Sequence, residues 1–81
     1  MEVKKISRGE IIVDDNGTLV RVLGEAMAIR TDGENSEYVV YENSVLYADS
    51  NENITDAHYK EKILAFIKED LKKKNLDVVV E

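Results

Sequence analysis

The sequence predicts a mainly β domain of the α+β class: a small bent antiparallel sheet or SH3-like partial barrel of about five strands, one C-terminal lid helix and a short final strand. The first 48 residues alternate short β-prone runs with turn residues, residues 56–74 have helical periodicity, and the last residues are again β-prone. A chain of 81 residues has room for one hydrophobic core. We therefore assign residues 1–81 to a single domain, with a strand meander over 1–48, a connector over 49–55, a helix over 56–74 and a terminal strand over 76–80.

Turn residues divide the meander into short strands. Asn16-Gly17 predicts a hairpin, because both residues tolerate the positive φ angles that primed turns require. Gly24-Glu25 is expected to reverse the chain again, the polar residues 32–36 to form a loop, and Glu42-Asn43 to form a further turn. The expected strands are residues 10–14, 18–23, 26–31, 37–41 and 44–48.

A helix is expected after the polar connector. Thr55 is its predicted N-cap, with Ile54 before it and Tyr59 placed to form a hydrophobic staple. Apolar residues then recur at spacings of three and four, which predicts one face packed on the sheet: Tyr59, Ile63, Leu64, Phe66, Ile67 and Leu71. Asn75 is the expected helix stop, and the strand after it is expected to pair with a sheet edge.

The order of these elements favours an SH3-like arrangement over an OB fold, in which the helix lies between the third and fourth strands. A flatter sheet with the helix across one face is the alternative. The terminal strand can close its own sheet, giving a monomer, or pair with the edge of a neighbouring chain. Its three consecutive valines favour a homodimer, because pairing would cover apolar side chains on a lone edge.

Composition excludes several classes of protein. The chain has no Cys, so it has no disulfide, thiolate metal site or thiol nucleophile. It lacks the apolar run of a secretory signal or membrane span, and we expect a cytoplasmic location. A formal net charge of -6 disfavours binding to nucleic acid or to an anionic membrane, since both attract clustered Lys and Arg.

No pattern indicates catalysis or a bound cofactor. His58 is the only histidine, and with Asp56 close by it is typical of a solvent-facing first helical turn. Residues 14–17 resemble the start of a calcium loop, but the fifth position is Thr18 and no helix flanks the segment, so a hairpin explains them better. The glycines have no phosphate-binding spacing. We expect a protein that is not an enzyme and has neither metal nor cofactor.

Negative charge is concentrated in the middle of the chain. Residues 24–56 hold one basic side chain, Arg30, and eight acidic ones, and tyrosines are interleaved with them. Tyr suits binding surfaces because it combines apolar area with a hydroxyl group, although Tyr is also β-prone and acidic residues also keep a small domain in solution. The predicted partner-binding residues are Glu34, Glu37, Tyr38, Tyr41, Glu42 and Tyr47.

Two functions fit this surface. The favoured one is a small protein-binding or regulatory module that docks the basic surface of a protein partner, without direct contact with nucleic acid or membrane. The alternative is an acidic decoy, encoded by a phage or mobile element, that mimics nucleic acid and inhibits a defence nuclease or polymerase. In the second case the partner's own nucleic acid would compete with the protein.

Overall fold

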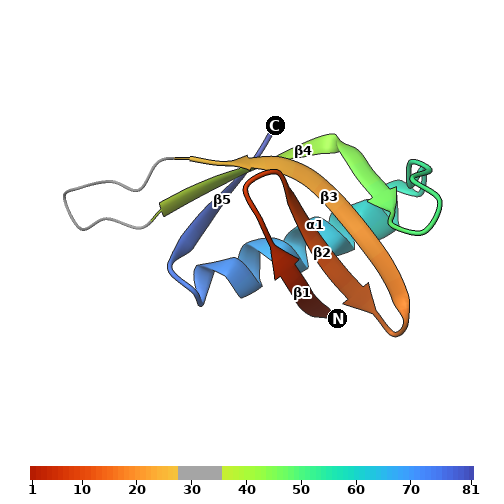
Figure 1. Ribbon diagram of the computed structural model, residues 1–81, viewed down its shortest axis with the longest axis horizontal. Helices are drawn as coiled ribbons and strands as arrows, with labels where there is room; N and C mark the ends of the chain where they lie inside the picture. Colours follow the sequence, from red (N-terminus) through yellow and green to blue (C-terminus); the bar gives the residue numbers. More distant parts are fainter. Residues whose placement is uncertain (28–35) are drawn as a thin grey trace.

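The chain folds into one curled sheet with a helix along one side. The computed structural model describes residues 1–27 and 36–81 (Figure 1). Its elements are β1 (Glu2–Ile6), β2 (Glu10–Asp15), β3 (Thr18–Ala26), β4 (Ser36–Tyr47), α1 (Ala57–Lys72) and β5 (Leu76–Val80). Within the described residues the strands form a five-stranded sheet in sequence order, β1-β2-β3-β4-β5. The predicted mainly β class, with a partial barrel and one helix before a final strand, is confirmed.

The hairpin at Asn16-Gly17 is also confirmed. Both residues have positive φ angles, 51° and 97°, and they join β2 to β3 next to the pair Asp15 and Thr18. The Gly17 amide donates a hydrogen bond to Asp14 Oδ1 at 2.8 Å. The segment that resembles a calcium loop is therefore a hairpin turn, with the Asp14 side chain holding the turn closed.

The predicted reversals at Gly24-Glu25 and Glu42-Asn43 are wrong. β3 continues through Gly24 without interruption, and β4 is one long strand across residues 42–43. Val22 pairs with Val45 whereas Gly24 pairs with Val40, so β4 has extra residues at this point. Such a bulge bends a strand, and β4 turns sharply in Figure 1. Of the predicted strand 26–31 and loop 32–36, residues 28–35 lie outside the described residues.

Two strands at the sheet edges also differ from the prediction. β1 was not predicted, because its sequence EVKKI places only Val3 toward the core and its lysines hide the β pattern. β5 pairs with β4 in parallel, so the sheet is mixed and not wholly antiparallel. The cause is α1, which carries the chain back across the sheet so that β5 starts at the same end as β4. β5 thus pairs with β4 of its own chain on one side, and the expected homodimer stays a prediction.

The helix begins one residue later than predicted. Its N-cap is Asp56 and not Thr55: Asp56 Oδ1 accepts hydrogen bonds from the backbone amides of His58 at 3.0 Å and Tyr59 at 3.2 Å. Asp56 consequently lies before the first turn. With this N-cap the two staple positions are Thr55 and Lys60 and not the predicted Ile54 and Tyr59. The helix also ends before the predicted residue 74: α1 stops at Lys72 with its C-cap at Lys73, and a turn in which Asn75 has a φ of 61° leads into β5. No helix among the described residues is long and apolar enough to cross a membrane.

The core lies between α1 and the inner face of the sheet. The predicted apolar face of the helix is confirmed at four buried residues, whereas Tyr59 and Phe66 are only partly buried against the core. The buried residues are Ile11, Val13, Val20, Val22, Tyr38, Val40, Val45, Ile54, Ile63, Leu64, Ile67 and Leu71. Within residues 1–27 and 36–81, no helix covers the opposite, outer face of the sheet, so its side chains are available to a partner.

Candidate protein-binding surface

Tyr38 is a core residue, which corrects its predicted role in partner binding. Its side chain is 1 % exposed, and its hydroxyl donates a hydrogen bond to the backbone oxygen of Ser7 at 2.7 Å. Burial raises the pKa of Tyr38, and the nearby Glu10 carboxylate raises it further. The side chain fastens the β1–β2 connection to β4 and cannot contact a partner.

Tyr41 and Tyr47 lie on opposite faces of the sheet. Tyr47 pairs with the buried Val20, which places it on the inner side near the start of α1. Tyr41 follows the buried Val40 and therefore points outward, where its hydroxyl lies 3.4 Å from Glu25 Oε2. The structure thus separates these two predicted residues, and the predicted Glu34 lies outside the described residues.

Strand β5 adds acidic side chains beside those of β4. Asp77 pairs with Glu37, Val79 pairs with Val39, and the Glu42 amide donates a hydrogen bond to the Glu81 backbone oxygen at 2.8 Å. Glu25 of β3 pairs with Val39 and therefore lies on the same face of the sheet. Glu42 lies in the β4 bulge directly after Tyr41 and is exposed. We call the outward-facing residues together with Glu42 the acidic outer surface: Glu25, Glu37, Tyr41, Glu42, Asp77, Val79 and Glu81.

The β5 contribution could not be found from the charge count along the chain, because residues 57–81 are nearly neutral as a whole. The alternation of the strand was the available signal. Leu76, Val78 and Val80 pack toward the core, so the side chains between them, including Asp77 and Val79, must point outward. Only the parallel pairing with β4 shows that these side chains join Glu37 and Tyr41.

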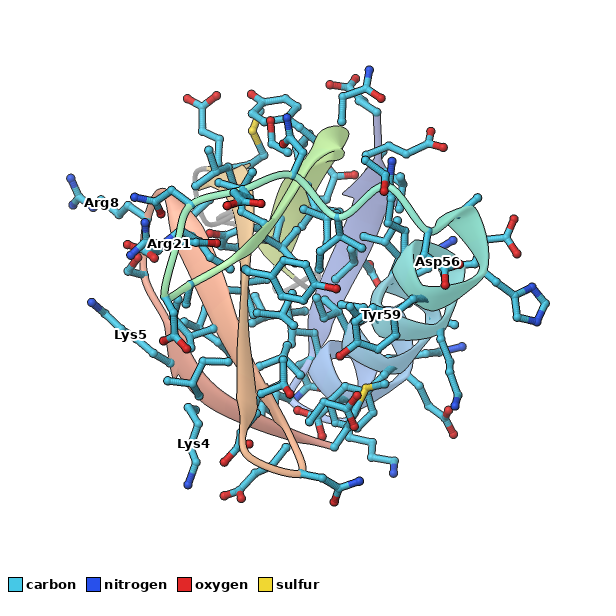
Figure 2. All side chains as sticks on the ribbon, turned by 90° about the vertical axis from the view of Figure 1, so that its right-hand side faces the viewer. Lys4, Lys5, Arg8, Arg21, Asp56 and Tyr59 are labelled. Atoms are coloured by element: carbon cyan, nitrogen blue, oxygen red, sulfur yellow. The ribbon has the colours of Figure 1, made fainter. Side chains whose placement is uncertain are left out.

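Basic side chains gather elsewhere in the described parts of the chain. Lys4, Lys5, Arg8 and Arg21 lie together on the β1–β2 side (Figure 2), and the remaining described lysines lie on α1 or directly after it. Arg21 is itself engaged: its Nε lies 2.9 Å from Glu10 Oε2, in an ion pair too poorly aligned to be a hydrogen bond, and its Nη1 donates to Asn51 Oδ1 at 2.7 Å. The β1–β2 side is nevertheless mixed in charge, because Glu2, Glu10, Asp14 and Asp15 lie on the same two strands.

A second polar contact joins the start of α1 to the β2–β3 hairpin. The Tyr59 hydroxyl donates a hydrogen bond to Asp15 Oδ2 at 2.7 Å. Burial, this hydrogen bond and the Asp15 charge raise the pKa of Tyr59 to about 12. His58 next to it is exposed, as expected for a first-turn residue, and only its backbone amide takes part in the cap.

We expect this contact to weaken at alkaline pH. The pKa of Tyr59 is higher in the folded protein than the ordinary 10.0, so its contribution to the free energy of unfolding is complete below pH 10 and is lost as pH rises through about 12. A tyrosinate absorbance titration should contain a component near pH 12 that Tyr59→Phe removes and Asp15→Asn shifts toward 10. Tyr59 titrating near pH 10 in the folded wild-type protein would contradict the contact.

The sequence profile of one protein family, immunity protein 74, matches residues 4–81, almost the whole chain. The chain belongs to this family. Immunity proteins bind and neutralise a cognate toxin, so the chain is a protein-binding inhibitor. Comparisons with curated proteins and with solved structures found no significant match.

Membership of the immunity protein 74 family means that the functional site must bind a toxin protein. An inhibitor of this kind needs an exposed surface complementary to its toxin, and the predicted protein-binding role is confirmed at that level. The acidic outer surface meets the requirement of exposure: Tyr41 is 37 % and Val79 is 39 % exposed, although both are large apolar side chains.

Proposed function

We propose that this immunity protein neutralises its toxin by binding a basic region of the toxin through the acidic outer surface. The observation that carries the proposal is the arrangement of carboxylates from β3, β4 and β5 around the exposed Tyr41 and Val79. Protein interfaces commonly combine an apolar centre that is desolvated on binding with a polar rim, and Tyr is frequent among the residues that dominate affinity.

Charge gives the surface its partner preference. The acidic outer surface carries five carboxylates, whereas the described basic side chains lie on the β1–β2 side, on α1 or directly after α1. A basic toxin surface would be attracted to the acidic outer surface more strongly than to the β1–β2 side, where acidic and basic side chains are mixed. Such a field accelerates association and fixes the orientation of the complex.

Reversal of three of these carboxylates should abolish most of the binding. We expect Glu25→Lys, Glu42→Lys and Glu81→Lys together to weaken binding of the cognate toxin by at least about 100-fold, because attraction becomes repulsion at an interface of charged pairs. Isothermal titration calorimetry at low and high salt measures the effect. The wild-type affinity should fall as salt rises, since exposed charges are screened.

The matched control changes net charge equally but elsewhere. Asp49→Lys, Glu52→Lys and Glu61→Lys replace three exposed carboxylates in the β4–α1 connection and on α1. We expect this variant to bind nearly as well as the wild type. Equal loss in both variants would show that only overall charge matters, and no loss in the first would refute the acidic outer surface as the contact.

The nucleic-acid decoy is a narrower form of the same proposal. If the toxin acts on nucleic acid and this protein occupies the same site, then a short duplex or single-stranded oligonucleotide should compete with the protein for the toxin. A ternary complex of toxin, oligonucleotide and immunity protein would exclude decoy action. It would leave inhibition by a contact outside the nucleic-acid site.

A further inference from the structure

The two edges of the sheet differ in how they are protected from pairing with another strand. Within the described residues, β1 and β5 are the edge strands. β1 has an irregular register between Val3 and Lys5 and carries the exposed Lys4 and Lys5. Bulges and lysines are common devices that prevent edge pairing. β5 has the sequence LDVVV, pairs with β4 in unbroken register and carries a single charged side chain.

The backbone of β5 presents hydrogen-bonding groups at its free edge. The Glu81 amide donates to the Val40 oxygen at 2.9 Å and the Glu81 oxygen accepts from the Glu42 amide at 2.8 Å, so both polar groups of Glu81 face β4. Backbone groups alternate in direction along a strand. Leu76, Val78 and Val80 consequently direct their amide and carbonyl groups away from β4, toward the open edge.

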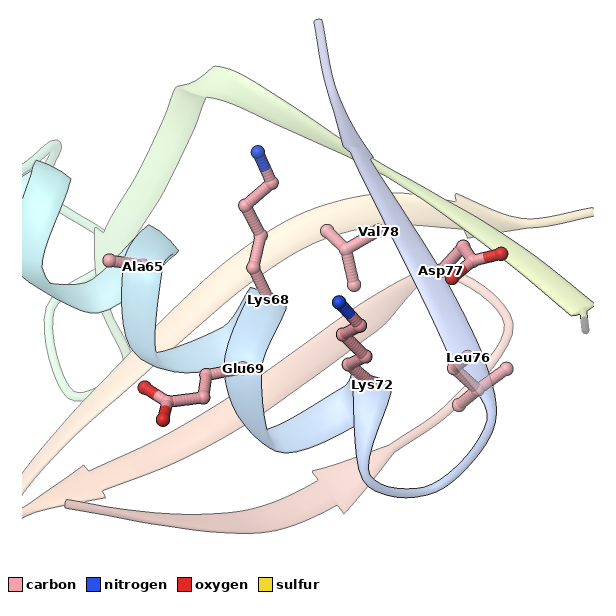
Figure 3. A pocket seen from close by; sticks show the side chains of 7 residues that line it. All are labelled: Ala65, Lys68, Glu69, Lys72, Leu76, Asp77 and Val78. Carbon is pink, nitrogen blue, oxygen red and sulfur yellow. The ribbon is translucent and has the colours of Figure 1, made fainter.

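An open groove lies directly beside this edge, between α1 and β5 (Figure 3). It has a volume of about 470 Å³, and in Figure 3 Lys68 and Lys72 extend from α1 beside Leu76 and Val78 of β5. The strand side is apolar at Leu76 and Val78, and on the helix side the two lysines extend beside the strand whereas the Glu69 carboxylate points away from β5 (Figure 3). Its lining residues are Ala65, Lys68, Glu69, Lys72, Leu76, Asp77 and Val78.

We propose that an extended segment of the toxin pairs with the free edge of β5 as a further strand of the sheet. Strand addition obtains affinity from backbone hydrogen bonds and specificity from alternate side chains. The inward side chains of the toxin strand would enter the groove, where an acidic residue among apolar ones meets Lys68 and Lys72. Its outward side chains would extend the acidic outer surface beside Asp77 and are expected to be basic.

Charge distinguishes this occupant from a second copy of the chain. A symmetric pairing of β5 with β5 would bring two copies of Lys68 and Lys72 to the same groove, and this repulsion disfavours it. A toxin strand of alternating charge has no such penalty. The inference rests on the proposed toxin binding but uses the edge of β5, which the carboxylate variants leave intact.

Val78→Pro tests the hydrogen bonds of the edge. Proline removes the outward amide of residue 78 without removing a bond to β4, and proline is tolerated in edge strands. We expect toxin affinity to fall about 10- to 100-fold, because the substitution leaves a carbonyl group of the toxin strand unpaired. The control is Val78→Thr, which keeps the backbone amide and a side chain of similar volume. We expect it to bind the toxin within a few-fold of the wild type.

The groove is tested by charge reversal on the helix. Lys68→Glu with Lys72→Glu should weaken toxin binding at least about tenfold, since the acidic inward residue would then be repelled. The control is Lys62→Glu with Lys73→Glu, which makes the same charge change at exposed positions outside the groove, including one at the same end of α1. The control should bind as the wild type does.

Hydrogen exchange on the unmodified complex gives a readout that does not depend on the folding of a variant. The amides of Leu76, Val78 and Val80 should exchange at least about tenfold more slowly when the toxin is bound. Unchanged exchange at all three amides, or full affinity in both the proline and the groove variants, would overturn strand addition. If the carboxylate variant still loses binding in that case, toxin contact through the acidic outer surface stands without it.

Discussion

Gly24→Ala is expected to destabilise the protein by about 3 kcal/mol or more, because the site has no room for a methyl group. A Cβ atom at Gly24 would lie 2.2 Å from the Val39 backbone oxygen, 2.8 Å from Tyr38 Cε1 and 3.1 Å from Val40 Cα. Two of these neighbours are backbone atoms of β4, so β3 and β4 would have to separate. Denaturant unfolding monitored by circular dichroism measures the loss.

Gly9→Ala is the matched control for this substitution. Gly9 has no heavy atom within 4 Å of the added Cβ position, and it lies in the β1–β2 connection. The same chemical change there should alter the free energy of unfolding by less than about 1 kcal/mol. Equal unfolding midpoints for the Gly24 and Gly9 variants would show that β3 and β4 are not in close contact at this point.

The same glycine explains why the sequence did not reveal the path of β3. A glycine between two β-prone runs is typical of a turn, and it is equally typical of a place where two backbones approach closely. Local sequence cannot distinguish these cases, because the neighbour that requires the glycine is in β4, far along the chain. The hairpin at Asn16-Gly17 was predictable because its cause, positive φ at two successive residues, is entirely local.

The candidate surface was predictable in composition but not in geometry. Charge counting indicated an acidic region around β4, and that region does contain Glu37, Tyr41 and Glu42. Alternation within β4 could not be extended across its bulge, so the opposite orientations of Tyr41 and Tyr47 required the pairing with β3. The acidic side chains of β5 required long-range pairing as well.

Burial of Tyr38 shows a related limit of sequence analysis. A tyrosine in an acidic strand has the same composition whether its ring faces solvent or the core. Here the hydroxyl reaches the Ser7 backbone oxygen across the sheet, which allows the polar atom to be buried without loss of its hydrogen bond. The presence of such an acceptor depends on β1, a strand that the sequence did not indicate.

Ile67→Ala is expected to cost about 2–5 kcal/mol in the free energy of unfolding, as is usual for truncation of a fully buried Ile. Ile67 lies in the middle of the buried face of α1 and has no exposed surface, together with Ile63 and Leu71. A domain of this size is stabilised by about 4–12 kcal/mol, so the variant should be close to half-unfolded at physiological temperature or should unfold at a much lower denaturant concentration.

The neighbours of Ile67 on α1 make the prediction specific to one face of the helix. Phe66 is only partly buried, so Phe66→Ala should cost less than Ile67→Ala even though it removes more atoms. Lys68 is exposed, and Lys68→Ala should change the free energy of unfolding by no more than about 0.5 kcal/mol. Guanidinium unfolding of the three variants gives the order directly. A larger loss for Phe66→Ala than for Ile67→Ala would mean that α1 is rotated about its axis, with Phe66 packed against the sheet and Ile67 turned toward its margin.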